Sequence, residues 1–418
     1  MLIEFKVANF RSFKGEQTLS MVASTASEHE ATNTFEPMSG FGRLLRSAVV
    51  YGPNASGKTS LLRALQFVKS LVLNSAATTA GPKPYSPFKF SASTRKKPSE
   101  FTVTFVEDGH RYEYGFTLGA ERVEEEWLID YVHARGRTMF ERKYDRTKDK
   151  YTWRFSPYLK GQRQRTVWRD ATREDALFLS TAVQLNSEQL RPVFDWFQKR
   201  LIVIVGAATL NASLTLKLLD EPDGKKRLLP FLREADPGIA DLEVKREPIP
   251  GGGAVVLQSA ANLIDIAGGQ PNLLRVTFSH IADSKSQVGL DFEEESNGTQ
   301  ILFRTAGAWL NVFKNGEVLL FDELDTSLHP LLSRFLINRF HSETTNVNNA
   351  QLIFSTHNTN HLDQSYFRRD QIWFVEKGED LASKLYPLTD FKPRNDEKLE
   401  TWYMRGRYGA LPILEDVD

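Results

Sequence analysis

One eight-residue stretch constrains this chain more than any other: Gly52-Pro53-Asn54-Ala55-Ser56-Gly57-Lys58-Thr59. It matches the phosphate-binding loop pattern G-x-x-x-x-G-K-[ST] at every fixed position. The flanks agree with it, because residues 47–51 form a short apolar run typical of a buried strand and residues 60–68 carry apolar side chains at helical spacing. A strand, a glycine-rich loop and a helix start, in this order, is the geometry that the pattern requires.

This geometry predicts a site for nucleotide phosphates. Backbone N–H groups of the loop and the positive end of the helix dipole would face a β-phosphate. Lys58 adds a full positive charge there, and the Thr59 hydroxyl is placed to ligate Mg²⁺. The predicted nucleotide-binding residues of this segment are Asn54, Ala55, Ser56, Gly57, Lys58, Thr59 and Ser60.

The composition excludes several classes of protein and predicts the cellular compartment. Its 418 residues include 53 basic and 53 acidic side chains and no cysteine. Balanced charge creates no global attraction to nucleic acid or anionic membranes, so any such site must be a local patch. The absence of cysteine excludes disulfides and thiolate chemistry. Because the longest apolar run, 201–205, is far shorter than the about 20 residues that span a bilayer, and the N-terminus lacks the basic region of a signal peptide, we expect a cytoplasmic protein with no membrane partner.

The first third of the chain is predicted to form an antiparallel sheet beside the phosphate loop. Residues 2–7 and 18–22 are typical of a short hairpin. Residues 101–106 and 112–116 alternate between apolar and polar side chains, and the turn signal Asp108-Gly109 lies between them, which predicts a second hairpin.

A second chemical signal is the stretch 316–323, in which four apolar residues are followed by Asp322 and Glu323. In phosphate-loop ATPases the strand beside the loop ends in an acid that holds the Mg²⁺ shell, and Asp322 fits that role. Glu323 would then polarise the attacking water as a general base. The alternative, an apolar strand that ends in a solvated acid pair, is disfavoured by the presence of the phosphate loop.

Two further segments carry polar groups at the ends of predicted elements. Residues 352–357 form a third buried-strand pattern that ends in His357, whose imidazole can hydrogen-bond a γ-phosphate and sense hydrolysis. A single histidine is more often structural, but its place one strand after the acid pair favours the functional role. Ser296 and Gly298 open an amphipathic helix whose N-terminus can bind a phosphate, including one held by another subunit. The alternative there is an ordinary serine-capped helix.

Together these motifs resemble the ABC-type ATPases, because the phosphate loop, an S-x-G-x-Q signature, the acid pair and the strand-end histidine occur in the order of that family. The opening Asn9-Phe10-Arg11-Ser12-Phe13 resembles the SMC, RecF and OLD branch rather than transporter subunits. Further segments resemble the compact ATPases of bacterial phage-defence and abortive-infection operons, PARIS-like systems among them. These segments are 295–299, 322–330, 368–374 and 406–412.

The resemblance implies an α/β fold, an ABC-type P-loop ATPase head with an antiparallel β-lobe and a helical or mixed insertion. Residues 1–170 would form the N-terminal half of the head with the phosphate loop and the β-lobe. Residues 171–288 would form the insertion, and residues 289–418 the C-terminal half with the signature, the acid pair and His357.

The same resemblance implies a nucleotide-sandwich homodimer, alone or within a higher oligomer of dimers. Ser296 and Gly298 of one subunit would complete the ATP and Mg²⁺ site of the other. Asp325 would lie in the loop that crosses between the sites, and Arg11 would reach the nucleotide phosphates. The chain departs from the family pattern in two respects. No segment matches the glutamine loop, so no residue is assigned to it. The insertion of about 120 residues is also far shorter than the coiled-coil insertion of SMC proteins, which excludes a long DNA-tethering arm.

These expectations combine into one function, an ATP-hydrolysing switch of bacterial phage defence that controls a separate effector, expected to be a Toprim-type nuclease. An OLD-like nuclease is one alternative, and its metal site would need a D-x-D pair. The D-x-D present, Asp416-Val417-Asp418, stands at the end of the chain, where supporting groups for metal ligands are hard to supply.

A RecF-like DNA-binding repair ATPase is the main alternative. Residues 135–169 hold twelve Lys or Arg against three acids, with aromatic residues interleaved. This mixture suits contact with a nucleic-acid backbone and stacking of bases. It also suits a docking surface for an acidic protein, or a solvated hairpin whose aromatic side chains face the core.

Overall fold

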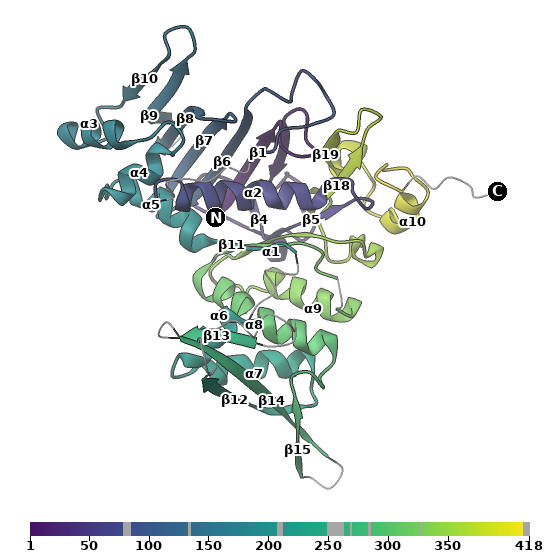
Figure 1. The fold of residues 1–418 in the computed structure, drawn as a ribbon. Coiled ribbons are helices and arrows are strands. Elements are labelled where there is room, and N and C mark those ends of the chain that lie inside the picture. The colour runs from purple at the N-terminus through teal and green to yellow at the C-terminus, as the bar shows by residue number, and fades with distance from the viewer. Residues whose placement is uncertain are drawn as a thin grey trace. The chain divides into compact units, whose positions relative to one another are not determined.

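The fold described below is that of a computed structural model of the chain (Figure 1). The structure describes residues 1–77, 85–132, 135–206, 212–248, 263–267, 270–282, 286–325 and 328–412. The chain divides into two compact units. The first unit comprises Met1–Val205, Gly316–Glu323 and Ile337–Asp418, and the second comprises Gly206–Asn315 and Leu324–Leu336.

The first unit contains an antiparallel sheet of seven strands in the order β10-β9-β8-β7-β6-β1-β2. Its strands are β1 (Leu2–Ala8), β2 (Gln17–Ser20), β6 (Ser99–Glu107), β7 (His110–Leu118), β8 (Val123–Val132), β9 (Arg135–Asp145) and β10 (Lys150–Phe155). Both predicted hairpins are confirmed, β1 with β2 and β6 with β7. Asp108 and Gly109 adopt φ values of 50° and 75°, the positive values that a tight two-residue hairpin turn needs.

A second sheet of the first unit has six strands in the order β11-β16-β17-β5-β18-β19. Its strands are β5 (Ser47–Tyr51), β11 (Leu201–Ile204), β16 (Val318–Phe321), β17 (Gln351–Ser355), β18 (Ile372–Lys377) and β19 (Ser383–Pro387). All neighbours pair in parallel except β18 with β19. Strands β5, β16 and β17 are buried at every position, which accounts for their unbroken apolar character. The parallel strands therefore all end at one edge of this sheet.

Helix α2 (Lys58–Asn74) follows β5 and runs across the strands of the antiparallel sheet in Figure 1. Its apolar side chains belong to one buried cluster that also includes residues of both sheets. The ring of Phe67 packs against Phe10 and Phe101, with centroid distances of 5.4 and 5.2 Å. Burial of each such ring stabilises the fold by about 1.5–3 kcal/mol, so these contacts hold the helix that follows the phosphate loop against the antiparallel sheet.

Short elements complete the first unit. They are α1 (Glu30–Asn33), β3 (Thr34–Phe35), β4 (Leu44–Leu45), α3 (Gln162–Ala171), α4 (Phe178–Gln184), α5 (Arg191–Asp195), the π-helical turn η1 (Trp196–Arg200), the 3₁₀ turns η4 (Thr359–His361), η5 (Arg369–Gln371) and η6 (Leu388–Phe391), and α10 (Leu399–Met404). No helix in the described part of the chain has the length and apolarity needed to cross a membrane.

The Arg368-Arg369-Asp370-Gln371 segment, one of those that carried the family resemblance, forms a network of buried hydrogen bonds and an ion pair in the first unit. The fully buried Arg368 pairs with Asp370 at 2.7 Å and donates hydrogen bonds to the carbonyls of Ala26 and Glu28. The side-chain carbonyl oxygen of Gln371 accepts hydrogen bonds from the Asn33 side chain and from the Arg368 backbone. The segment therefore ties residues 24–33 to the start of β18, a role in the fold that accounts for its composition.

The second unit combines helices with a four-stranded sheet. Its elements are α6 (Ser213–Asp220), α7 (Gly224–Ala235), α8 (Asn297–Asn315), β12 (Ile239–Pro248), β13 (Leu263–Ala267), β14 (Gln270–Ile281) and β15 (Gln287–Asp291), and α9 (Pro330–His341) begins in this unit and ends in the first. Strand β14 pairs antiparallel with β12, β13 and β15. Helices α6 and α8 approach closely at Gly307, where a Cβ atom would lie 2.2 Å from the Thr215 nitrogen.

The compact units divide the chain at positions that differ from the three predicted segments. Residues 171–205 group with the first unit, and residues 289–315 group with the second. The assignment of 1–170, 171–288 and 289–418 to two head halves and an insertion stays a prediction. Within 171–288 the described elements are helical first and then mostly strands, as the sequence pattern indicated.

Candidate functional site

The phosphate loop connects β5 to α2, in the strand–loop–helix context that the sequence predicted. The loop backbone needs glycine at its second fixed position, because Gly57 has φ 119° and an added Cβ would lie 2.4 Å from the Ser383 Oγ. The Lys58 ammonium group is buried and donates hydrogen bonds to the carbonyls of Gly52 and Pro53 at 2.6 and 3.1 Å. Those carbonyls hold the cation inside the curve of the loop.

The loop residues fit a nucleotide triphosphate with Mg²⁺. The Ser56 Oγ is buried and finds no hydrogen-bond partner among the described residues, so it is available to a ligand oxygen. Asn54 and Ala55 are exposed, and Thr59 and Ser60 are half-buried in the first turn of α2. Helix α2 has 17 residues, and the free N–H groups of its first turn add donors for an anion.

The order of the six-stranded sheet corrects one expectation. The acidic strand β16 does not lie directly beside the phosphate-loop strand β5, because β17 lies between them. Ser355 of β17 is in register with Val50 of β5, and Phe354 of β17 is in register with Phe321 of β16. The strand that leads to His357 is therefore the direct neighbour of both other strands. Sequence order alone could not show this, because neighbours in a parallel sheet need not be consecutive in the chain.

Asp322 and Glu323 follow β16 at the edge where the parallel strands end. The fully buried Ser355 hydroxyl donates to the Asp322 Oδ1 at 2.6 Å and accepts from the Glu323 backbone N–H at 2.8 Å. Glu323 has φ 54°, a left-handed conformation that is uncommon for a residue with a side chain. Sequence reasoning missed Ser355, although a serine that closes a fully apolar strand is a signal that could have found it.

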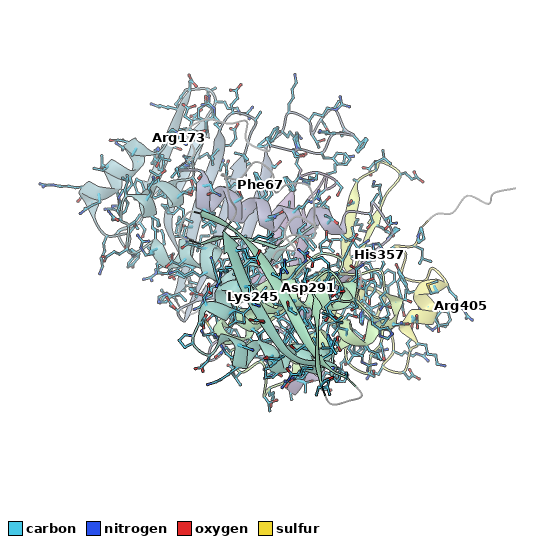
Figure 2. All side chains as sticks on the ribbon, turned by 60° about the horizontal axis from the view of Figure 1, so that its bottom comes forward. Phe67, Arg173, Lys245, Asp291, His357 and Arg405 are labelled. Atoms are coloured by element: carbon cyan, nitrogen blue, oxygen red, sulfur yellow. The ribbon has the colours of Figure 1, made fainter. Side chains whose placement is uncertain are left out.

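His357, which is labelled in Figure 2, follows the end of β17 by two residues and so lies at the edge where the parallel strands end. Its Nε2 is 3.9 Å from the Glu323 Oε1. Both side chains are partly exposed, at 38% and 48% of their free surface, so solvent and a ligand can reach them. The structure thus brings together the two residues that were predicted as catalytic, and their roles stay predictions.

The N-terminal Asn-Phe-Arg-Ser-Phe motif reaches the phosphate loop through Ser12. The Ser12 carbonyl accepts a hydrogen bond from the Ser383 N–H at 2.7 Å, and the Ser383 hydroxyl donates to the Ser56 carbonyl. Arg11 is exposed, with its guanidinium centre 5.7 Å from the Phe10 ring centroid. Although the side chain is exposed, the protein groups around it remove part of its hydration, and this desolvation and then the charge of Arg63 lower the pKa of Arg11. Its contact with nucleotide phosphates stays a prediction, and sequence reasoning missed Ser383 because β19 is remote in the chain.

The remaining predicted site residues, Ser296, Gly298 and Asp325, belong to the second unit. Ser296 caps helix α8, since its Oγ accepts from the Thr299 N–H at 3.1 Å. Ser296 is nevertheless exposed and Gly298 is half-buried, so the start of α8 is open to solvent. Asp325 is half-buried, and its carbonyl accepts from the Leu328 N–H at 3.3 Å. The action of these residues on the site of a partner subunit stays a prediction.

The basic segment 135–169 was expected to be a nucleic-acid site, a docking surface or a solvated hairpin. Of the twelve cations in 135–169, seven form ion pairs with acidic side chains. Trp153 and Phe155 pack against the core, and Trp168 is buried. This arrangement favours the interpretation of a paired surface whose aromatic side chains face inward. The terminal D-x-D, Asp416 to Asp418, lies outside the described residues.

Comparison with known proteins adds a family to this geometry. Among solved structures, the chain is similar to the one named "Crystal structure of the SmcHead bound to the C-winged helix domain of ScpA", with 13% identity, 92% of this chain and 96% of that chain covered, and a TM-score of 0.39. A TM-score of 0.39 carries no argument about the fold, so the fold is described from the strands and helices of this chain alone. No curated protein matches the sequence. Residues 47–363 match the family model described as "AAA domain, putative AbiEii toxin, Type IV TA system". The predicted α/β fold of a P-loop ATPase head is confirmed, and the chain belongs to this AAA-domain family.

Proposed function

We propose that the chain is an ATP-binding and ATP-hydrolysing switch of bacterial phage defence that controls a separate effector through ATP-dependent dimerisation. The observation that carries this proposal is the convergence of three chemical groups. Strands β5, β17 and β16 lie side by side and end at one sheet edge, followed by the phosphate loop, His357 and the acid pair. A protein that only bound phosphate would need the loop, but it would not need an acid pair and an imidazole beside it.

The loop would bind the triphosphate, and oxygen ligands beside it would hold the metal. Lys58 and the N–H groups at the start of α2 supply the positive potential for the phosphates. The Thr59 hydroxyl and the Asp322 carboxylate are oxygen donors of the kind that Mg²⁺ prefers. Mg²⁺, when bound, neutralises the charge that develops on the β- and γ-phosphates.

Glu323 and His357 would act on the reacting end of the nucleotide. The Glu323 carboxylate would accept a proton from the attacking water, and the His357 imidazole would hydrogen-bond the γ-phosphate. The His357 Nε2 lies 3.9 Å from the Glu323 Oε1, so one bound γ-phosphate would be within reach of both. Ser355 fixes the backbone of Glu323 and the carboxylate of Asp322 relative to β17.

Dimerisation would supply the other face of each site. The start of α8, with the exposed Ser296 and the half-buried Gly298, offers N–H groups of a 19-residue helix to a γ-phosphate held by a second copy. Closure and opening of the dimer would then follow ATP binding and hydrolysis, which is the property of a switch.

The family description supports a role in defence through a second protein. It names an AbiEii-type toxin of a type IV toxin–antitoxin system, and such a system joins two gene products. The resemblance to phage-defence operons indicates that the effector is a Toprim-type nuclease. The balanced charge of the chain leaves recognition of that effector to local surfaces.

Substitution of Glu323→Gln tests the assignment of the general base. The change keeps the size of the side chain and removes its basicity, so phosphate release should fall at least about 10²-fold while ATP still binds. Phosphate release and equilibrium binding of a fluorescent ATP analogue would be measured on the same preparation. Glu343→Gln, an exposed substitution away from the sheet edge, is the matched control and should be neutral. Normal hydrolysis by the Glu323→Gln variant would show that another group activates the water.

A further inference from the structure

A cavity of about 540 Å³ opens beside helix α10, and none of the roles proposed above uses it. We call it the α10 cavity. Among the described residues, its lining comprises four cationic side chains, two acidic ones, a threonine and the indole of Trp402, and no aliphatic side chain. The cations are Arg394, Lys398, Arg405 and Arg407. This volume lies within the range of sites that hold a small molecule or one unit of a polymer.

The lining of the α10 cavity has twice as many cationic side chains as acidic ones. Within the described residues, the side chains of Arg394, Lys398 and Arg405 form no ion pair, in contrast to most of the cations in 135–169. The three cations are exposed. Exposed arginines and lysines that gather around one cavity in excess of its acidic side chains are the electrostatic feature of sites for polyanions.

The two acids of the lining, Glu397 and Asp396, differ in how much negative charge they present to the cavity. The Glu397 carboxylate pairs with Arg407 at 2.7 Å and accepts from the Tyr408 hydroxyl at 2.5 Å and the Arg394 N–H at 3.1 Å. Burial would raise the pKa of Glu397, but these partners hold it below its ordinary value. Its side chain is 6% exposed, so its charge is directed to these partners and not to the open surface of the cavity. Asp396 is then the acid on the open surface of the cavity.

Trp402 adds a surface for stacking. The indole is 36% exposed, and the guanidinium centres of Arg405 and Arg407 lie 5.5 and 5.1 Å from its centroid. Figure 2 labels Arg405 in this part of the chain. Indole and guanidinium planes are the groups on which unpaired nucleobases stack. An acidic protein segment would use the same cations, so the exposed indole beside them is the feature that favours a nucleobase.

We propose that the α10 cavity binds single-stranded nucleic acid, with Lys398 and Arg405 contacting phosphates and Trp402 stacking on a base. Bases are free to stack on a protein only when they are unpaired, so the site should prefer a single strand to a duplex. This inference goes beyond the proposed function, because neither ATP hydrolysis nor control of an effector requires it. It also places nucleic-acid binding at α10 and not in 135–169.

The test is fluorescence anisotropy of a labelled oligothymidylate with the full-length chain at several salt concentrations. Wild-type binding should weaken steeply as salt rises, because phosphate contacts release counterions. The Lys398→Ala/Arg405→Ala double variant should bind roughly tenfold more weakly. Lys150→Ala/Arg163→Ala removes the same charge from two exposed cations of the 135–169 segment and should bind like the wild type. Equal melting temperatures of all variants would establish that the fold is intact.

Three single substitutions at two positions separate stacking from charge. Trp402→Ala should weaken binding roughly tenfold, whereas Trp402→Phe, which keeps an aromatic face, should retain most of it. Asp396→Asn removes the open acid of the cavity and should tighten binding at low salt. These three changes leave the ATP site untouched, so failure of this proposal would be distinguishable from failure of the proposed function.

The proposal is overturned if the wild-type chain does not bind oligothymidylate at low salt. It is also overturned if the Lys398/Arg405 double variant binds as well as the Lys150/Arg163 variant. A third contrary outcome is that polyglutamate binds as tightly as oligothymidylate and that Trp402→Ala changes neither. In that case the α10 cavity would accept an acidic protein segment.

Discussion

His341 illustrates how burial sets the charge of a single residue. It is buried at the end of α9, where its Nε2 lies 2.8 Å from the Ser47 Oγ and 3.4 Å from the Gln371 Nε2. Burial, and then the charges of His29 and Arg46, lower the pKa of His341 from 6.5 to about 3. The imidazole is therefore neutral in the folded state near neutral pH. It belongs to the hydrogen-bond network at the start of the phosphate-loop strand β5.

This pKa shift predicts a loss of stability in mild acid. Below pH 6.5 the unfolded chain takes up a proton at His341, whereas the folded chain does so only near pH 3. The contribution to stability is therefore complete above pH 6.5 and declines as the pH falls, by about 2 kcal/mol at pH 5. Urea unfolding at pH 7 and pH 5 measures the decline. His341→Asn cannot titrate and should show a smaller decline, and equal declines in both proteins would contradict the assignment.

At the scale of elements, the position of β17 between β5 and β16 organises the candidate site. The middle strand β17 ends in Ser355, which hydrogen-bonds the acid pair, and the chain then continues to His357. One strand therefore positions both the acids and the histidine. Ser355 does not touch the reacting atoms in our proposal. It acts by holding Asp322 and the backbone of Glu323 in place, and we regard it as a positioning residue.

Ser355→Ala should lower kcat for ATP hydrolysis by roughly 10²-fold, because small displacements of catalytic groups are costly. KM for ATP should change little, since the phosphate loop keeps its own contacts. The substitution also leaves the Glu323 N–H without its partner, which should cost about 1–3 kcal/mol of stability, so kinetics would be measured well below the melting temperature. Ser355→Thr restores a hydroxyl and should recover much of kcat. A normal kcat in Ser355→Ala would contradict the positioning role.

At the scale of the whole molecule, the candidate site residues are shared between two compact units. Lys58, Asp322, Glu323 and His357 belong to the first unit, and Ser296 belongs to the second. In the proposed dimer, the second unit of one copy would serve the first unit of the other. Activity would then depend on pairs of chains, a property that mixing experiments can detect.

Mixing Lys58→Ala chains with Gly298→Asp chains tests this dependence. Each variant alone should be inactive, but a heterodimer would hold one site with an intact loop and an intact signature. Random pairing makes half of the dimers heterodimers with one good site each, so the mixture should regain about a quarter of the wild-type rate. Phosphate release against mixing ratio measures it.

A control mixture sharpens the result. Lys58→Ala with Glu323→Gln places both defects in the same half of the site, so no heterodimer has a complete site and no activity should return. Recovery in the control mixture, or none in the Gly298→Asp mixture, would rule out the composite site as proposed.

Some of this structure could be read from local sequence. The phosphate loop, the β6–β7 hairpin and the buried strands before Asp322 and His357 were predictable, because each depends on residues within a few positions of one another. Ser355 and Ser383 were not assigned, because their partners lie 33 and 327 positions away and sequence spacing carries no signal for such contacts.

By itself, the sequence determined which groups are present at the candidate site: the loop with Lys58, the acids Asp322 and Glu323, and His357. Only the tertiary structure decided how they are arranged. It placed β17 between β5 and β16 and Ser355 beside the acid pair, and, within the described residues, it left three cations of the α10 cavity without an ion pair. The physical reason is that strand order and side-chain pairing depend on how distant segments pack, which local propensity does not encode.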